Sequence, residues 1–135
     1  MPAPSAEPRR RQPLRALLLL YALLVLVASL YPTVPAWASA HDRTAHFFAY
    51  LLLGALLAVS LGVATRDASG RALPGVWWRC GAALLLGTCY GAGIEVAQRF
   101  TGRAPQLEDA LANLLGVAAG AGGVTLLSRL RRGAA

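Results

Sequence analysis

The chain has 135 residues, of which 56% are hydrophobic and 14% are charged, and its formal net charge is +7. A soluble domain of this length carries far more charge on its surface, so the composition excludes an ordinary soluble protein and indicates a membrane protein. Lys is absent, and most of the arginines flank apolar runs instead of forming one patch. Positive charge at such positions sets membrane topology, so we expect no binding of nucleic acid.

Four apolar runs are long enough to cross a bilayer, which takes about 20 helical residues. They extend from about Leu14 to Tyr31, from Ala45 to Ala64, from about Val76 to Ala97 and from about Leu107 to Leu127. Strands are not expected, because an open sheet leaves its backbone unsatisfied in lipid and no run alternates like a barrel strand. The sequence therefore predicts an all-α polytopic membrane protein, with four transmembrane helices in a small bundle.

The N-terminal region permits two interpretations. Its arginines, the first apolar run and the sequence Ala38-Ser39-Ala40 imitate a signal peptide, whose cleavage would leave a mature chain starting at His41. We favour an uncleaved span, because the run is long for a signal peptide. The expected organisation is a disordered basic tail over 1–13, the four-helix transmembrane domain over 14–130 and a short cytoplasmic tail over 131–135.

The positions of the arginines predict the orientation. The connections after the first and third spans carry Arg43, Arg99 and Arg103, and all the other arginines lie at the termini or between the second and third spans. Because cytoplasmic segments are enriched in basic residues, both termini are expected to be cytoplasmic. The expected location is the bacterial cytoplasmic (inner) membrane, as a multi-pass protein.

Pairs of glycines on the last two spans have the spacing of close helix packing. Gly87 and Gly91 lie on the third span, and Gly116 and Gly120 lie on the fourth. Small residues four apart let two helix backbones approach each other. We interpret these pairs as packing signals.

Polar side chains form three groups in the apolar spans, where such residues are rare and usually functional. The groups are Asp42, His46 and Tyr50 at the start of the second span, Glu95, Gln98 and Arg99 at the end of the third, and Asp109 and Asn113 at the start of the fourth. Residues four apart share a helix face, and alternating spans place all three groups on the outer side. We therefore predict one outward-facing polar pocket.

Each group also has a purely structural explanation. Asp109 can complement the dipole of its helix, and Glu95 and Arg99 can form a local ion pair. His46 can be a neutral, hydrogen-bonded side chain near the membrane surface. The coincidence of the three groups at one depth is what favours a shared site.

Two segments resemble the ordered motifs of the VanZ-like membrane proteins. The segment "DRTAHFFAYLLLG" matches the first motif, with Arg43 in place of the usual Lys. The segment "GIEVAQRFTGRAPQLEDALANLLG" matches the second, through Glu95, Gln98, Arg103, Asp109, Asn113 and Gly116. The resemblance spans roughly residues 14–130. It implies four helices and a link to glycopeptide antibiotic resistance of the teicoplanin type in founding members, and it implies no established reaction.

The first functional hypothesis is a binding protein of the cell envelope. Arg43, Arg99 and Arg103 are expected to hold a phosphate or carboxylate of a lipid-linked cell-wall intermediate or a glycopeptide through charge-assisted bonds. Tyr50, Gln98 and Asn113 complete the expected set of ligand-binding residues.

The alternative is an envelope enzyme acting on a lipid-linked substrate. In that case His46 is the general base, Asp42 orients it, and Glu95 or Asp109 is the acid. Dense ligand spacing is missing from the sequence, so neither a metal nor a cofactor is predicted. Ion transport would need polar groups across the whole bilayer, which the inner halves of the spans lack.

Overall fold

The computed structural model describes residues 8–31, 42–63, 75–102 and 106–133. Their helices are α1 (Pro8–Leu30), α3 (Asp42–Ser60), α4 (Val76–Gln98) and α5 (Leu107–Gly133), and each contains a stretch long and apolar enough to cross a membrane. Within these ranges the structure has no strand. The predicted all-α architecture with four spans is confirmed.

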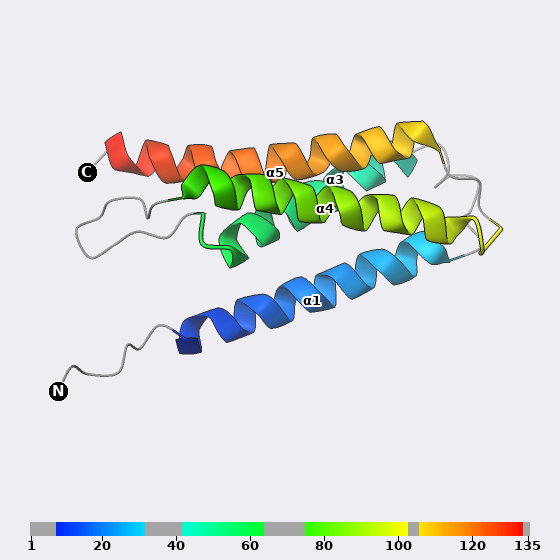
Figure 1. The fold of residues 1–135 in the computed structure, drawn as a ribbon, viewed down its shortest axis with the longest axis horizontal. Helices are drawn as coiled ribbons and strands as arrows, with labels where there is room; N and C mark the ends of the chain where they lie inside the picture. The colour runs from blue at the N-terminus through cyan, green and yellow to red at the C-terminus, as the bar shows by residue number, and fades with distance from the viewer. Residues whose placement is uncertain (1–7, 32–41, 64–74, 103–105, 134–135) are drawn as a thin grey trace.

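The four helices run in alternating directions along the bundle (Figure 1). The starts of α3 and α5 and the ends of α1 and α4 lie together, and we call this the site end of the bundle. The start of α1 and the end of α5 lie at the opposite end. The chain therefore crosses the bundle an even number of times, while the cytoplasmic location of its termini stays a prediction.

The closest contact in the bundle joins α3 to α5, and glycines make it possible. A Cβ atom placed on Gly120 would lie 2.0 Å from the carbonyl oxygen of Leu51, and one on Gly116 would lie 2.4 Å from that of Phe47. From the other side, Gly54 of α3 lies against the backbone of Val117. The predicted packing role of the glycine pair on α5 is confirmed, and it holds the two helices backbone to backbone.

Helix α4 covers this pair through its own glycines. Gly87 faces the side chain of Val117, and Gly91 faces the side chains of Tyr50 and Asn113. Because these glycines have no side chain, residues of α3 and α5 fill the space beside α4. The core of the bundle therefore lies mainly among α3, α4 and α5, and one side of α1 also packs against it.

Helix α1 is attached to the outside of this core, and its span is the least buried of the four. The Tyr21 hydroxyl donates a hydrogen bond of 2.9 Å to the carbonyl oxygen of Ala49 on α3. The Tyr90 hydroxyl of α4 donates to the carbonyl oxygen of Ala22. Two tyrosines thus connect α1 to two different helices.

Two helices are longer than expected. Helix α1 begins at Pro8, so residues 8–13 of the expected basic tail are helical, while residues 1–7 lie outside the described part of the chain. Helix α5 continues through residue 133, so most of the expected C-terminal tail is helical. Hydropathy marks the part of a helix that lies in hydrocarbon, whereas arginine is a good helix former and lets the helix continue beyond it. Proline is also well suited to the first position of a helix.

Helix α3 begins at Asp42 and ends at Ser60, a few residues earlier at both ends than the apolar run. Gly62 terminates it with a φ of 77°, a left-handed conformation that favours glycine. The amide of Val63 donates to the carbonyl oxygen of Ala58 at 2.9 Å, as in a Schellman cap. The earlier start places Asp42 in the first helical turn, on the same helix as His46.

Aromatic and basic residues meet at the end of the bundle opposite the site end. Trp77 and Trp78 at the start of α4 are exposed, and the guanidinium of Arg129 lies 4.6 Å from the centre of the Trp77 ring. Tryptophan is enriched at membrane interfaces, where one side of the ring contacts lipid and the other contacts polar groups. This arrangement is the one expected where a membrane boundary lies near the start of α4.

Candidate functional site

The polar residues of α3 lie on the face that is turned into the bundle. His46 and Tyr50 are buried, with exposed fractions of 7% and 0%, whereas the side chain of Asp42 is 24% exposed. Their spacing of four residues produces this shared face, because four residues make little more than one helical turn. The rings of His46 and Tyr50 are nearly parallel, with centres 6.3 Å apart.

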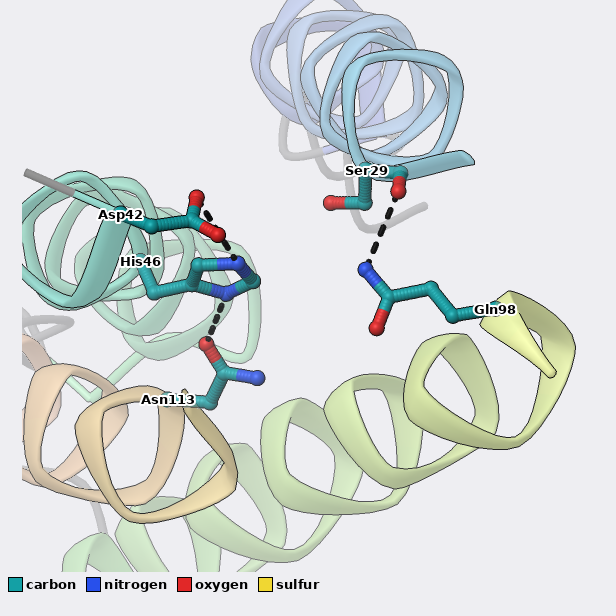
Figure 2. Close-up of polar contacts among 5 residues, drawn as sticks. All are labelled: Ser29, Asp42, His46, Gln98 and Asn113. Carbon is teal, nitrogen blue, oxygen red and sulfur yellow. Dashed lines mark hydrogen bonds and ion pairs between the residues drawn. The ribbon is translucent and has the colours of Figure 1, made fainter. Parts of the chain in front are cut away.

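A direct hydrogen bond joins His46 to α5. The distance between His46 Nδ1 and Asn113 Oδ1 is 2.9 Å, and both side chains are buried (Figure 2). Because an amide oxygen is an acceptor, the ring nitrogen Nδ1 must carry the hydrogen. When the ring is neutral, the other nitrogen, Nε2, then carries the lone pair. Nε2 lies 3.7 Å from Oδ1 of Asp42.

Asp109 brings a second carboxylate to the same place. It lies one turn before Asn113 on α5 and is 5% exposed. Three atoms that could bind a metal, one from each of Asp42, His46 and Asp109, lie within 4.8 Å of one another. The structure therefore unites the polar groups of α3 and α5 in one cluster.

The polar residues of α4 are buried at the same end of the bundle. Glu95 is 8% exposed and Gln98 is 2% exposed. Gln98 Nε2 donates to the carbonyl oxygen of Ser29 on α1 at 3.0 Å, as Figure 2 shows. Gln98 thus connects α4 to α1, while Glu95 lies one turn after Gly91, the glycine that packs on Tyr50 and Asn113.

The two described arginines of the predicted site do not join the buried cluster. Arg43 and Arg99 are exposed, and Arg103 lies outside the described residues. Arg43 follows Asp42 directly and so points about 100° away around α3. Both described arginines lie at the site end, where their long side chains can extend toward head groups.

Helices α1 and α3 enclose a cleft of about 260 Å³ beside this cluster. Its apolar lining comes from both helices, and its polar lining consists of Asp42, His46, Ser29 and the tyrosines Tyr21 and Tyr50. The Tyr50 hydroxyl is buried and has no hydrogen-bond partner among the described residues. The cleft therefore combines an apolar wall with polar groups at the site end.

Sequence reasoning missed the contribution of α1. Tyr21 and Ser29 line the cleft, and neither was assigned to the candidate site. The available signal was weak, since it consists of two polar side chains in an otherwise apolar span. Their position against α3 depends on helix packing, which residue spacing within α1 does not reveal.

Comparison with known families supports the resemblance found in the motifs. A family model described as VanZ/LLP1 matches residues 16–128, a segment that includes most of α1 and α5 and all of α3 and α4. The comparison with curated proteins and the comparison with solved structures each found no match.

Proposed function

This chain belongs to the VanZ/LLP1 family of membrane proteins, and we propose that it binds a lipid-linked intermediate of the bacterial cell envelope in the cleft between α1 and α3. The observation that carries the proposal is the two-part lining of that cleft. Leu24, Val25 and Ala28 offer an apolar wall from α1, while Asp42 and His46 offer polar atoms from α3. An amphiphile has the complementary division into a chain and a head group.

The size of the cleft defines which part of the ligand it holds. Its volume of about 260 Å³ is just below the range of about 300–1,000 Å³ for small-molecule pockets, so it accommodates part of a lipid and not the whole molecule. The remainder of a hydrocarbon chain would extend along the exposed leucines of α1, such as Leu20 and Leu24.

The charges at the site end favour a particular kind of head group. The carboxylate of Asp42 accepts hydrogen bonds, so it suits the hydroxyl and amide groups of a sugar or peptide. The exposed Arg43 and Arg99 suit a phosphate, which guanidinium groups bind through paired hydrogen bonds. A sugar carried on a polyprenyl phosphate has both features. The link to glycopeptide tolerance of the teicoplanin type, which the family resemblance implies, would operate through this ligand.

Binding can be tested by filling the cleft. Ala45 lines it, and Ala45→Trp places a large ring between α1 and α3. Ala118→Trp on the exposed surface of α5 is the matched control. Native mass spectrometry of the purified chain in detergent would measure binding of a polyprenyl phosphate and of its sugar-linked diphosphate, with phosphatidylglycerol as the competing membrane lipid.

We expect the wild type and Ala118→Trp to retain the polyprenyl lipids in the presence of excess phosphatidylglycerol. Ala45→Trp should bind them at least tenfold more weakly. Equal binding by Ala45→Trp and the control would refute the cleft as the binding site. Equal competition by phosphatidylglycerol would refute recognition of a cell-wall lipid.

The hydrogen bond at His46 Nδ1 favours an enzyme as the second candidate function. With Nδ1 held by Asn113, the opposite nitrogen Nε2 is available as a general base. Asn113 thereby takes the orienting role that the sequence assigned to Asp42. If the chain is an enzyme, purified protein should turn over the sugar-linked polyprenyl diphosphate, and His46→Gln should abolish turnover while the lipid still binds. Absence of turnover by the wild type would reject this alternative.

A further inference from the structure

We propose that Asp42, His46 and Asp109 bind a divalent transition-metal ion, with Zn²⁺ as the representative. Spacing along the sequence predicted no metal, because it offers just two of these ligands on one helix. The third comes from α5, which the packing of Gly116 and Gly120 brings against α3. The three donor groups are one imidazole and two carboxylates.

The distances fit such an ion. One ligand atom from each of the three residues lies within 4.8 Å of the others, and His46 Nε2 and Asp42 Oδ1 are 3.7 Å apart. Tetrahedral zinc with bonds of about 2.0–2.1 Å to nitrogen and oxygen separates its ligand atoms by roughly 3.4 Å. A shift of a few tenths of an ångström therefore brings this pair to the spacing that zinc requires.

The hydrogen bonding of His46 provides a second, independent observation. Metal-binding histidines usually donate their other ring N–H to a carbonyl or carboxylate, which fixes the ring and directs its lone pair at the metal. Asn113 Oδ1 accepts from Nδ1 at 2.9 Å and thereby directs Nε2 toward Asp42. The same arrangement would be expected of the second shell of a metal site.

The asparagine that holds the His46 ring has a second polar atom, its amide nitrogen Nδ2. Asn113 is 2% exposed, and its Nδ2 has no hydrogen-bond partner among the described residues. In Figure 2 this amide nitrogen is turned into the space between His46 and Gln98. With three protein ligands, the ion would keep a fourth coordination position. Zinc sites with three protein ligands generally leave that position open for water or substrate.

The metal site does not depend on lipid binding. It shares Asp42 and His46 with the cleft, but Asp109 belongs to the cluster and not to the cleft lining. Asp109→Asn should therefore reduce the affinity for zinc without reducing binding of the lipid. The two proposals can fail separately.

The test uses the full chain in detergent, purified without a histidine tag and stripped of metal by a chelator. Cys80 and Cys89 are replaced by Ser and His41 by Gln, so that His46 is the remaining histidine. Isothermal titration with Zn²⁺ measures affinity and stoichiometry. We expect one Zn²⁺ per chain and a loss of at least tenfold in affinity in Asp109→Asn and in His46→Gln.

The matched control is Glu108→Gln, which removes the neighbouring, exposed carboxylate and should bind zinc like the parent. Asn113→Leu should weaken binding about 10–100-fold, as loss of a second-shell partner does. Pulsed EPR of the Cu²⁺-loaded parent, in which His46 is intact, should detect coordination by an imidazole nitrogen whether or not any variant folds. The proposal is overturned if the parent binds no stoichiometric zinc, if Asp109→Asn and His46→Gln bind it as tightly as the parent, or if no imidazole nitrogen is coordinated.

Discussion

Replacing Gly120 with Ala should separate α3 from α5. The added Cβ atom would lie 2.0 Å from the carbonyl oxygen of Leu51 and 2.7 Å from the amide nitrogen of Ala55. Real Cβ contacts essentially never fall below 3.0 Å, so the Leu51 oxygen must retreat by at least 1.0 Å, the difference between 3.0 Å and 2.0 Å. Both obstructing atoms belong to backbone, so no side-chain rotation can relieve the overlap.

The size of the effect follows from two opposing contributions. Overpacking typically costs about 1–3 kcal/mol, and a backbone contact falls at the upper end of that range. Alanine in place of glycine within a helix returns about 0.5–1 kcal/mol. We therefore expect Gly120→Ala to lower the free energy of unfolding by about 2–2.5 kcal/mol.

Gly122→Ala is the matched control on the same helix. Nothing lies within 4 Å of the Cβ position at Gly122, so this variant should be as stable as the wild type or slightly more stable. Reversible unfolding in mixed micelles of a mild detergent and sodium dodecyl sulfate, followed by circular dichroism, would measure both variants. If Gly120→Ala proved as stable as Gly122→Ala, the inferred backbone contact between α3 and α5 would be wrong.

Two further predictions concern α1 and the membrane orientation. Tyr21→Phe removes the hydrogen bond to α3 and should lower the free energy of unfolding by about 0.5–1.5 kcal/mol. Tyr31 is exposed, so Tyr31→Phe should leave the free energy of unfolding unchanged. Equal losses in the two variants would argue against the hydrogen bond. In a chain without its native cysteines, a cysteine at Gln106 should react with an impermeant maleimide added to intact cells, and one at Arg131 should react after lysis. The reverse pattern of labelling would contradict cytoplasmic termini.

Much of the fold could be predicted because lipid imposes strong requirements on sequence. Each span needs about 20 apolar residues, so four runs of that length predict four helices. The helix ends were less predictable, since the backbone continues to form helical hydrogen bonds outside the hydrocarbon. This is why α1 begins at Pro8 and α5 ends at Gly133.

The site was predictable within each helix and less so between helices. The spacing of Asp42, His46 and Tyr50 placed them on one face, which is a property of any helix. The pairing of His46 with Asn113 depends on the register between α3 and α5, which the glycine contacts fix. Sequence spacing gave no sign that Gln98 would contact α1 and not the histidine cluster. The binding, catalytic and metal roles of these residues remain predictions.

The unequal attachment of the helices makes one wall of the cleft easier to displace than the other. Helix α3 contacts α5 backbone to backbone, whereas the polar connections of α1 include single hydrogen bonds that involve Tyr21, Tyr90 and Gln98. Each such bond contributes about 0.5–1.5 kcal/mol, and apolar contacts of α1 are exchanged for similar contacts with acyl chains when it moves outward. If a hydrocarbon chain binds in the cleft as proposed, its expected path is sideways from the bilayer by displacement of α1, which leaves the contact between His46 and Asn113 in place.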